Sequence, residues 1–368
     1  MRLILASVLL ATTAAAAQSP FVSMTESLVH GGRQLKGLVA IELDGQRVEK
    51  RYVLRTPSNW NGSLVIGAHG GGGGNNFDRS GKVIGTDETA LDDVIGRHAL
   101  ARGVIYASVD RDGSGNGRAG LSLTTQFADH VRGELSRRGF AAPLRTYIVG
   151  LSAGGGIARM AAEQMPPRFH GALLIAAAGG DAVTRLDRQT RIAALWPLID
   201  PRAHHGLADT DAKIVAYAEA NGTPVAARRL WPYTGGSAVA AASRPAGNVE
   251  NSTAKPGIPV IEVVGTWDDL VIRELRAYAN RVEPKDRHRL YEVEGVWHMS
   301  GDDDGVMSFQ YIAESRMKLD KDVADAMGEG ASYLSTVREA FDHLVSWVEK
   351  GKAPPASQTV RPNAPLRQ

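Results

Sequence analysis

Apolar residues along the chain fall into two patterns: short continuous runs, and longer segments with helical character. Runs with the length of buried β-strands occupy residues 63–68, 104–109, 144–149, 172–178, 259–264 and 289–293. Helical segments lie at residues 91–101, 121–138, 155–164, 270–282, 309–319 and 333–348. Because strands and helices alternate, the pattern predicts an α/β fold with a mainly parallel central sheet and helices on both faces.

The first β-rich segments differ from the others. Residues 38–43 and 51–55 flank the turn signal Asp44-Gly45, and this arrangement predicts an antiparallel hairpin. The sheet is therefore expected to be parallel except near this hairpin.

A change in composition divides the expected core in two. Residues 180–257 break the alternation, are rich in Ala, Gly, Arg and Pro, and predict an inserted cap of helices and loops. The α/β core is then expected over residues 35–179 and 258–350. The tail at 353–368 is rich in proline and is expected to be disordered.

The first residues predict export. Arg2 precedes the apolar run 3–10, and residues 15–17 form a small-residue cleavage site before Gln18. Residues 1–17 therefore predict a removed signal peptide, and the mature protein is expected to be secreted or periplasmic. The apolar run is too short to span a bilayer comfortably, so a membrane anchor is the less favoured interpretation. No integral membrane segment is expected after cleavage.

Composition narrows the classes of partner and the source of stability. The chain has 42 basic and 40 acidic side chains, a net charge of +2 that becomes +1 (41 − 40) without Arg2. This balance argues against nucleic acid as the main partner. The chain has no cysteine, so an exported form must be stabilised by burial of a large core rather than by disulfides.

The strongest chemical signal is the sequence Gly150-Leu151-Ser152-Ala153-Gly154, which reads G-x-S-x-G. An apolar strand precedes it and a helical segment follows, which is the strand–turn–helix context that this motif requires. Ser152 is then expected at the apex of a strained turn, with its hydroxyl clear of the sheet. Small neighbours let the two arms of the turn approach, and the first helical amides face the reacting oxygen.

A second signal is a glycine-rich segment directly after a predicted strand. His69 is followed by five glycines, residues 70–74. A flexible linker could have this composition, but the preceding buried strand favours a loop that brings bare backbone to a ligand. A phosphate-binding loop would need a following Gly-Lys-Ser/Thr, which is missing. The loop is therefore expected to be shaped by His69 and to supply an oxyanion donor from Gly71 or Gly72, together with Ala153.

A serine hydroxyl becomes an effective nucleophile when a histidine takes its proton and a carboxylate orients that histidine. His298 follows the last predicted strand, where such a base is expected. Asp268 follows the strand before it and is the preferred acid, with Asp269 as the alternative. Helix N-terminal capping is the structural role that either aspartate could have instead. Ser152, Asp268 and His298 are thus the predicted catalytic residues.

Two polar segments of the sequence could indicate a metal-binding site. Residues 110–117 place alternating oxygen-bearing side chains after a strand, but Leu121 stands where a calcium loop needs a bidentate Glu. A polar loop over the substrate mouth is the preferred interpretation. His204 and His205 are adjacent, and adjacent side chains diverge in a strand or a helix, so they rarely chelate one ion. Neither a metal nor an organic cofactor is expected.

Together these motifs resemble the α/β-hydrolase fold family of serine hydrolases, over residues 35–350 without the cap. The segments that carry the resemblance are 69–72, 150–154, 265–268 and His298. The chain looks most like secreted esterases of the polyhydroxybutyrate-depolymerase and feruloyl-esterase type. Its ending at 344–354 is similar to the chain ends of tannases and feruloyl esterases. Those families often carry disulfides, which this chain cannot form.

The resemblance implies a secreted serine hydrolase that cleaves carboxylic esters of a small or polymeric substrate through an acyl-enzyme. Two alternatives remain. An exported peptidase or amidase would use the same triad through the same tetrahedral intermediate. A non-catalytic binding protein could use the same scaffold, because fold does not imply function, although a triad together with a glycine-rich loop argues against it.

Overall fold

The computed structural model describes most of the chain between Ser19 and Arg367. The described residues are 19–70, 75–77, 83–111, 117–179, 252–266, 268, 271–296, 298 and 332–367. Outside them lie the expected signal peptide at 1–17, most of the expected cap at 180–257, the helix near 309–319, Gly71 and Gly72, and Asp269.

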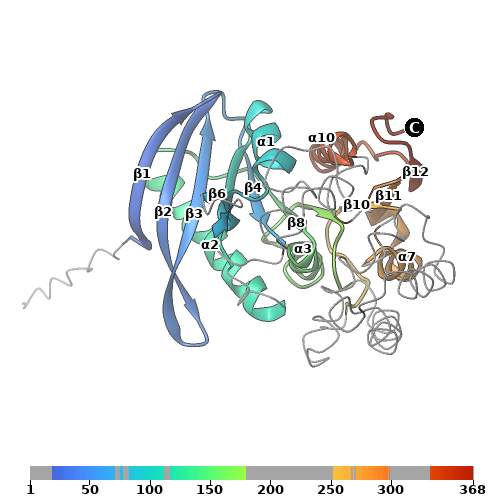
Figure 1. Cartoon of the computed structure of the whole chain (residues 1–368), viewed down its shortest axis with the longest axis horizontal. Helices are drawn as coiled ribbons and strands as arrows, with labels where there is room; N and C mark the ends of the chain where they lie inside the picture. Colours follow the sequence, from blue (N-terminus) through green and yellow to red (C-terminus); the bar gives the residue numbers. More distant parts are fainter. Residues whose placement is uncertain are drawn as a thin grey trace, which may run out of the picture.

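A ten-stranded sheet forms the centre of the protein (Figure 1). In spatial order its strands are β1 (Phe21–Val29), β2 (Gly32–Leu43), β3 (Gln46–Pro57), β7 (Ile105–Val109), β4 (Ser63–Ala68), β8 (Arg145–Leu151), β9 (Gly171–Ile175), β10 (Val260–Gly265), β11 (His288–Val293) and β12 (Gln358–Val360). The first three pair antiparallel, and β3 is also antiparallel to β7. Every neighbouring pair from β7 to β12 is parallel, so the expected mainly parallel sheet is confirmed. A small second sheet pairs β5 (Asn75–Phe77) with β6 (Val83–Thr86).

Helices cover both faces of the large sheet (Figure 1). One face carries α2 (Gly117–Arg137), α3 (Ala153–Gln164) and α7 (Ile272–Arg281). The other carries the π-helical turn η2 (Asp92–Gly96), α1 (Arg97–Ala101) and α10 (Leu334–Lys350). Two short 3-10 turns are η1 (Asp87–Thr89) and η4 (Lys285–Arg287). Because both faces are covered, β4, β7 and β8 are almost wholly buried, which explains their continuous apolar runs.

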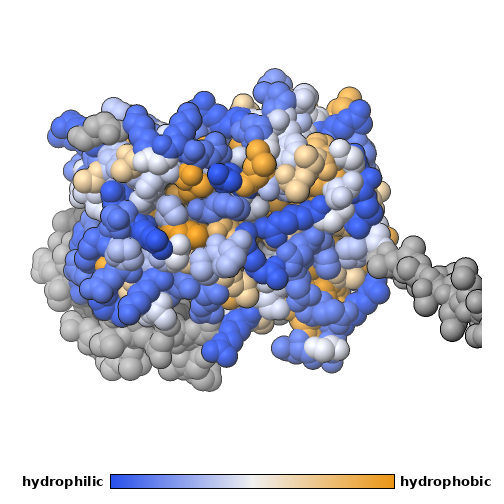
Figure 2. Space-filling view, turned by 180° about the vertical axis from the view of Figure 1, so that it is seen from behind, coloured by the Kyte–Doolittle hydropathy of each residue, from blue (hydrophilic) through white to orange (hydrophobic). Residues whose placement is uncertain are grey.

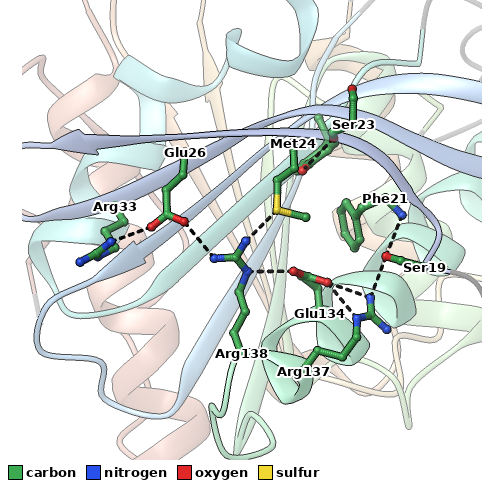
Figure 3. A network of polar contacts seen from close by, with 10 residues as sticks. Ser19, Phe21, Ser23, Met24, Glu26, Arg33, Glu134, Arg137 and Arg138 are labelled. Carbon is green, nitrogen blue, oxygen red and sulfur yellow. Dashed lines mark hydrogen bonds and ion pairs between the residues drawn. The ribbon is translucent and has the colours of Figure 1, made fainter.

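The sheet begins at Phe21 rather than at residue 35, where the core was expected. Most side chains of β1 are exposed, so its sequence lacks the alternation that marks a half-buried strand. Figure 3 shows how this edge is held: Arg138, the residue directly after α2, donates to Glu26 of β1 at 3.2 Å. Arg33 donates to the same carboxylate at 2.8 Å. The hydrogen bonds from Arg33 and Arg138 lower the pKa of Glu26 below its usual value.

The prediction of a disordered tail at 353–368 is wrong. Strand β12 pairs in parallel with β11, and both Val360 and Leu366 are 6% exposed. The Tyr291 hydroxyl donates to the Pro355 carbonyl at 2.8 Å. Prolines prevent a long regular element here, but a short edge strand is compatible with them. The contacts that order the tail come from β11 and α10, and local composition does not reveal them.

The face of the molecule seen in Figure 2 is predominantly polar. Figure 2 shows the face opposite to that of Figure 1, where hydrophobic residues form small groups among hydrophilic ones. Within the described part of the chain, no helix has both the length and the apolar character needed to cross a membrane.

The ordered tail leads to a stability prediction. Leu366→Ala should lower the free energy of unfolding by about 2 kcal/mol, because it removes a buried side chain from the core cluster. Leu144→Ala is the matched control, since Leu144 is 69% exposed and should change stability by no more than about 0.5 kcal/mol. Urea unfolding of both variants measures the difference. Equal midpoints would mean that the tail does not pack on the core.

Candidate active site

Four expected site residues follow the carboxyl ends of parallel strands. His69 directly follows β4 and Ser152 directly follows β8, while Asp268 and His298 follow β10 and β11. Strands β4 and β8 are neighbours, but the chain leaves β4 toward β7 and leaves β8 toward β9, on the opposite side. Ligands of open parallel sheets bind where successive connections diverge in this way. Ser152 therefore lies at the position that the topology favours for chemistry.

Ser152 occupies a strained turn between β8 and α3. Its φ of 52° and ψ of −118° are unfavourable for a residue with a side chain, and such conformations persist only where the surroundings hold them. The Ser152 amide donates to the Ile175 carbonyl at 2.9 Å, and its carbonyl accepts the Ala178 amide at 2.9 Å. These bonds to the end of β9 and to the residues that follow it keep the turn in place.

The turn also requires glycine on both sides of the serine. A Cβ atom on Gly150 would lie 2.1 Å from the Gly154 carbonyl oxygen. A Cβ atom on Gly154 would lie 1.9 Å from the carbonyl oxygen of Ala68, the last residue of β4. Backbone atoms cannot move aside as a flexible side chain can. The two glycines therefore allow the ends of β4 and β8 to come together.

The structure brings Ser152, His298 and Asp268 into one hydrogen-bonded chain. His298 Nε2 lies 2.9 Å from Ser152 Oγ, and His298 Nδ1 lies 2.8 Å from Asp268 Oδ2. Since the Asp268 carboxylate can only accept when ionised, Nδ1–H donates to it and Nε2 remains available to accept the serine proton. The Tyr333 hydroxyl donates to the His298 carbonyl at 2.9 Å, which ties the histidine to the start of α10.

Asp268 is the member of the chain that sequence reasoning preferred over Asp269. It is 1% exposed, so its carboxylate is shielded from water beside the imidazole. The structure makes Val271, not Asp268, the N-cap of α7, and among the described residues this cap has no side-chain hydrogen bond. The Asp268 backbone carbonyl instead accepts the Ile272 amide at 3.0 Å. Asp269 lies outside the described residues.

Of the expected oxyanion donors, only Ala153 is described. It is the first residue of α3, where backbone N–H groups have no acceptor within the helix and the helix dipole favours negative charge. The glycine-rich segment starts close to it, because a Cβ atom placed on Gly70 would lie 3.4 Å from the Ser152 Cβ. Gly71 and Gly72 follow directly in the chain.

A buried cluster of His69, Asp87, Asp110 and Arg111 lies at the start of the glycine-rich segment. One oxygen or nitrogen atom from each of the first three lies within 4.8 Å of the others, a spacing that could suit a cation. His69 Nε2, however, accepts the backbone amide of Arg111 at 3.0 Å, and Nδ1 donates to the Gly70 carbonyl at 2.9 Å. Both ring nitrogens of His69 thus form hydrogen bonds to the backbone, so the cluster supports the start of the glycine-rich segment.

A buried ion pair lies behind the serine turn. Arg159 of α3 donates to Glu262 of β10 at 2.6 Å and to the Ala178 carbonyl at 3.0 Å. Its guanidinium also stacks on Tyr278, 4.5 Å from the ring centre. Burial would raise the pKa of Glu262, but the Arg159 charge and the nearby His288, whose Nε2 lies 3.5 Å from Glu262 Oε2, outweigh it and lower that pKa. The pair fixes α3, and with it the turn, against the sheet.

Sequence reasoning did not single out Arg111, Arg159 or Glu262. A signal existed for two of them. Glu262 is the one charged residue in the apolar run 259–264, and Arg111 is the second residue after the apolar run 104–109, behind Asp110. Charges at such positions need buried partners, but the sequence does not say which residues those partners are.

The strand order and the strained serine turn are those of the α/β-hydrolase fold. Residues 124–365 match the sequence profile of a family described as alpha/beta hydrolase domain, and the chain belongs to this family. The matched range includes Ser152, Asp268 and His298, and it extends into the tail that carries β12. No curated protein sequence matches the chain significantly.

Solved structures support the same fold. Feruloyl esterase B from Aspergillus oryzae is 13% identical, with 91% of this chain and 88% of that chain covered and a TM-score of 0.50. Vibralactone cyclase is 15% identical, with 88% and 83% covered and a TM-score of 0.50. An esterase from Pyrobaculum calidifontis is 18% identical, with 83% and 86% covered and a TM-score of 0.45. At these identities the two structures with a TM-score of 0.50 show the fold alone.

The close approach at the serine turn leads to a second stability prediction. Gly154→Ala should lower the free energy of unfolding by about 3 kcal/mol, because its Cβ would collide with the end of β4. The matched control is Gly133→Ala in α2, where a Cβ atom meets only Arg137 Nη1, at 3.6 Å. This control should raise stability by about 0.5–1 kcal/mol through helix propensity. Thermal and urea unfolding test both, and a neutral Gly154→Ala would contradict the steric account.

Proposed function

We propose that the protein is a secreted serine hydrolase that cleaves carboxylic ester bonds. The observation that carries the proposal is the chain of two hydrogen bonds from Asp268 through His298 to Ser152, which ends in a strained turn. A serine that was only structural would need neither an oriented imidazole nor an unfavourable backbone conformation.

In the proposed reaction, Ser152 Oγ attacks the ester carbonyl carbon while His298 Nε2 takes the hydroxyl proton. Asp268 stabilises the imidazolium that forms and keeps Nδ1–H in place. The Ala153 amide and an amide of the glycine-rich segment, Gly71 or Gly72, stabilise the oxyanion. The imidazolium then gives its proton to the leaving alcohol, and an acyl-enzyme remains. Water attacks the acyl-enzyme with His298 again as base, which releases the acid and restores the serine.

Membership of the hydrolase family supports bond hydrolysis but does not name the bond. The preference for an ester over an amide rests on feruloyl esterase B, which shares the fold across 91% of this chain, and on the esterase-like chain ending at 344–354. The triad itself serves either bond, because both pass through a tetrahedral oxyanion.

Substitution of the triad tests the proposal. Ser152→Ala should lower kcat/KM on a p-nitrophenyl ester by roughly 10⁴-fold or more, and Asp268→Asn should lower it by about 10⁴-fold through the wrong imidazole tautomer. Ser136→Ala, an exposed serine in α2, is the control and should leave the rate unchanged. Full activity of Ser152→Ala would rule out the mechanism. A wild type that turns over the matched anilide faster than the ester would instead indicate an amidase.

The proposal includes export, on the basis of residues 1–17. Expressed in a bacterial host with its full sequence, the protein should appear outside the cytoplasm with Gln18 as its first residue. Leu9→Arg, which places a charge in the apolar run, should leave it in the cytoplasm. N-terminal sequencing of each cell fraction measures this. A cytoplasmic wild-type protein that retains Met1 or Arg2 would contradict export.

A further inference from the structure

We propose that Arg159 and Glu274 are positioning residues that keep Ser152 in its reactive turn by holding the Ala178–Gly179 peptide from both ends. The inference rests on the proposed function. Neither side chain belongs to the expected triad, and both act on the nucleophile through the backbone of the segment that follows β9.

The peptide between Ala178 and Gly179 is held by two buried side chains from two helices. Arg159 of α3 donates from Nη1 to the Ala178 carbonyl at 3.0 Å. Glu274 of α7 accepts the Gly179 amide on Oε2 at 3.2 Å. Both residues are buried, with 1% and 2% of their surface exposed. Because the peptide is trans, its C=O and N–H point in opposite directions, and holding both groups fixes its orientation.

The segment held in this way bonds directly to the nucleophile. The Ala178 amide donates to the Ser152 carbonyl at 2.9 Å, and the Ser152 amide donates to the Ile175 carbonyl at 2.9 Å. Both backbone polar groups of Ser152 therefore have partners within residues 175–178. Since the φ of 52° at Ser152 is unfavourable, the turn depends on such contacts to persist. A shift of Ala178 would move the serine with it.

The segment after β9 is itself strained, so it needs an external hold. Ala176 has a φ of 44°, which is uncommon for a residue with a side chain, and Gly179 has a φ of 82°. The segment also lies close against α3, because a Cβ atom on Gly156 would be 2.8 Å from the Ala178 oxygen. Strained backbone persists only where its surroundings determine it. Arg159 and Glu274 supply that constraint from opposite ends of one peptide.

The guanidinium of Arg159 also links the serine helix to the strand that leads to Asp268. Its Nη2 donates to Glu262 of β10 at 2.6 Å, while Nη1 holds the Ala178 carbonyl. Burial would lower the pKa of Arg159, but the Glu262 carboxylate outweighs this effect and raises it. The side chain is therefore charged at neutral pH. Lysine would keep the charge but lacks the planar fork that bonds a carboxylate and a carbonyl together.

Kinetics of Arg159→Lys and Glu274→Leu test the inference, with active sites counted by titration with a fluorophosphonate. Each variant should lower kcat per site on a p-nitrophenyl ester by about 10- to 100-fold, because the nucleophile is displaced from its attacking position. KM should change by less than about threefold, since substrate binding does not depend on that position. The rate at which the fluorophosphonate modifies Ser152 should fall by a similar factor. A purely structural role would lower the number of sites and leave the rate per site unchanged.

Two further variants serve as controls. Glu274→Gln retains an oxygen that can accept the Gly179 amide, so it should recover most of the activity that Glu274→Leu loses. Arg55→Lys alters another buried arginine, which pairs with Asp92 between β3 and η2. It should lower the melting temperature and leave the rate per site unchanged.

The inference is overturned if Arg159→Lys and Glu274→Leu keep the rate per site within about threefold of wild type, or if they change only KM. It is also overturned if Glu274→Gln loses as much activity as Glu274→Leu. If Arg159→Lys does not fold, the two Glu274 variants decide, and if Glu274→Leu does not fold either, the role is structural and the inference fails. Wild-type turnover that does not depend on Ser152 would instead overturn the proposed function.

Discussion

The close approach of two backbone segments controls the candidate site. A Cβ atom on Gly154 would lie only 1.9 Å from the carbonyl oxygen of Ala68, the last residue of β4. This approach is possible because the side chain is missing, and it places Gly70 directly against Ser152. The expected nucleophile Ser152 and Gly70, at the start of the glycine-rich segment, are thus neighbours because Gly150 and Gly154 carry no side chain.

Two buried arginines hold the segments that this approach brings together. Arg111 binds the Gly70 carbonyl on the β7 side of the turn, and Arg159 binds the Ala178 carbonyl on the β10 side. Ala178 in turn donates to the Ser152 carbonyl. A buried charge is tolerated only when it is paired and hydrogen-bonded, which Glu262 achieves for Arg159. Because the chain has no cysteine, these segments are held by such polar contacts and not by disulfides.

The sequence was most informative where a candidate site residue follows a buried strand. Ser152, Asp268 and His298 could each be found because an apolar run ends shortly before them, and such strand ends meet at one edge of a parallel sheet. It was least informative at the margins of the sheet. Strand β1 has exposed side chains at most positions, and the tail around Leu366 is ordered by partners on α10 and β11. Neither segment has a local pattern that would identify it.

The amino-acid sequence by itself determined the α/β class, the serine turn and the identity of the residues that could form a triad, because these depend on local periodicity and on short motifs. Only the tertiary structure decided that Asp268 faces His298 at 2.8 Å, that the tail completes the sheet, and that Arg111 holds the Gly70 carbonyl. Those contacts join residues far apart in the chain, and hydrogen-bond geometry across such separations is set by packing of the whole core.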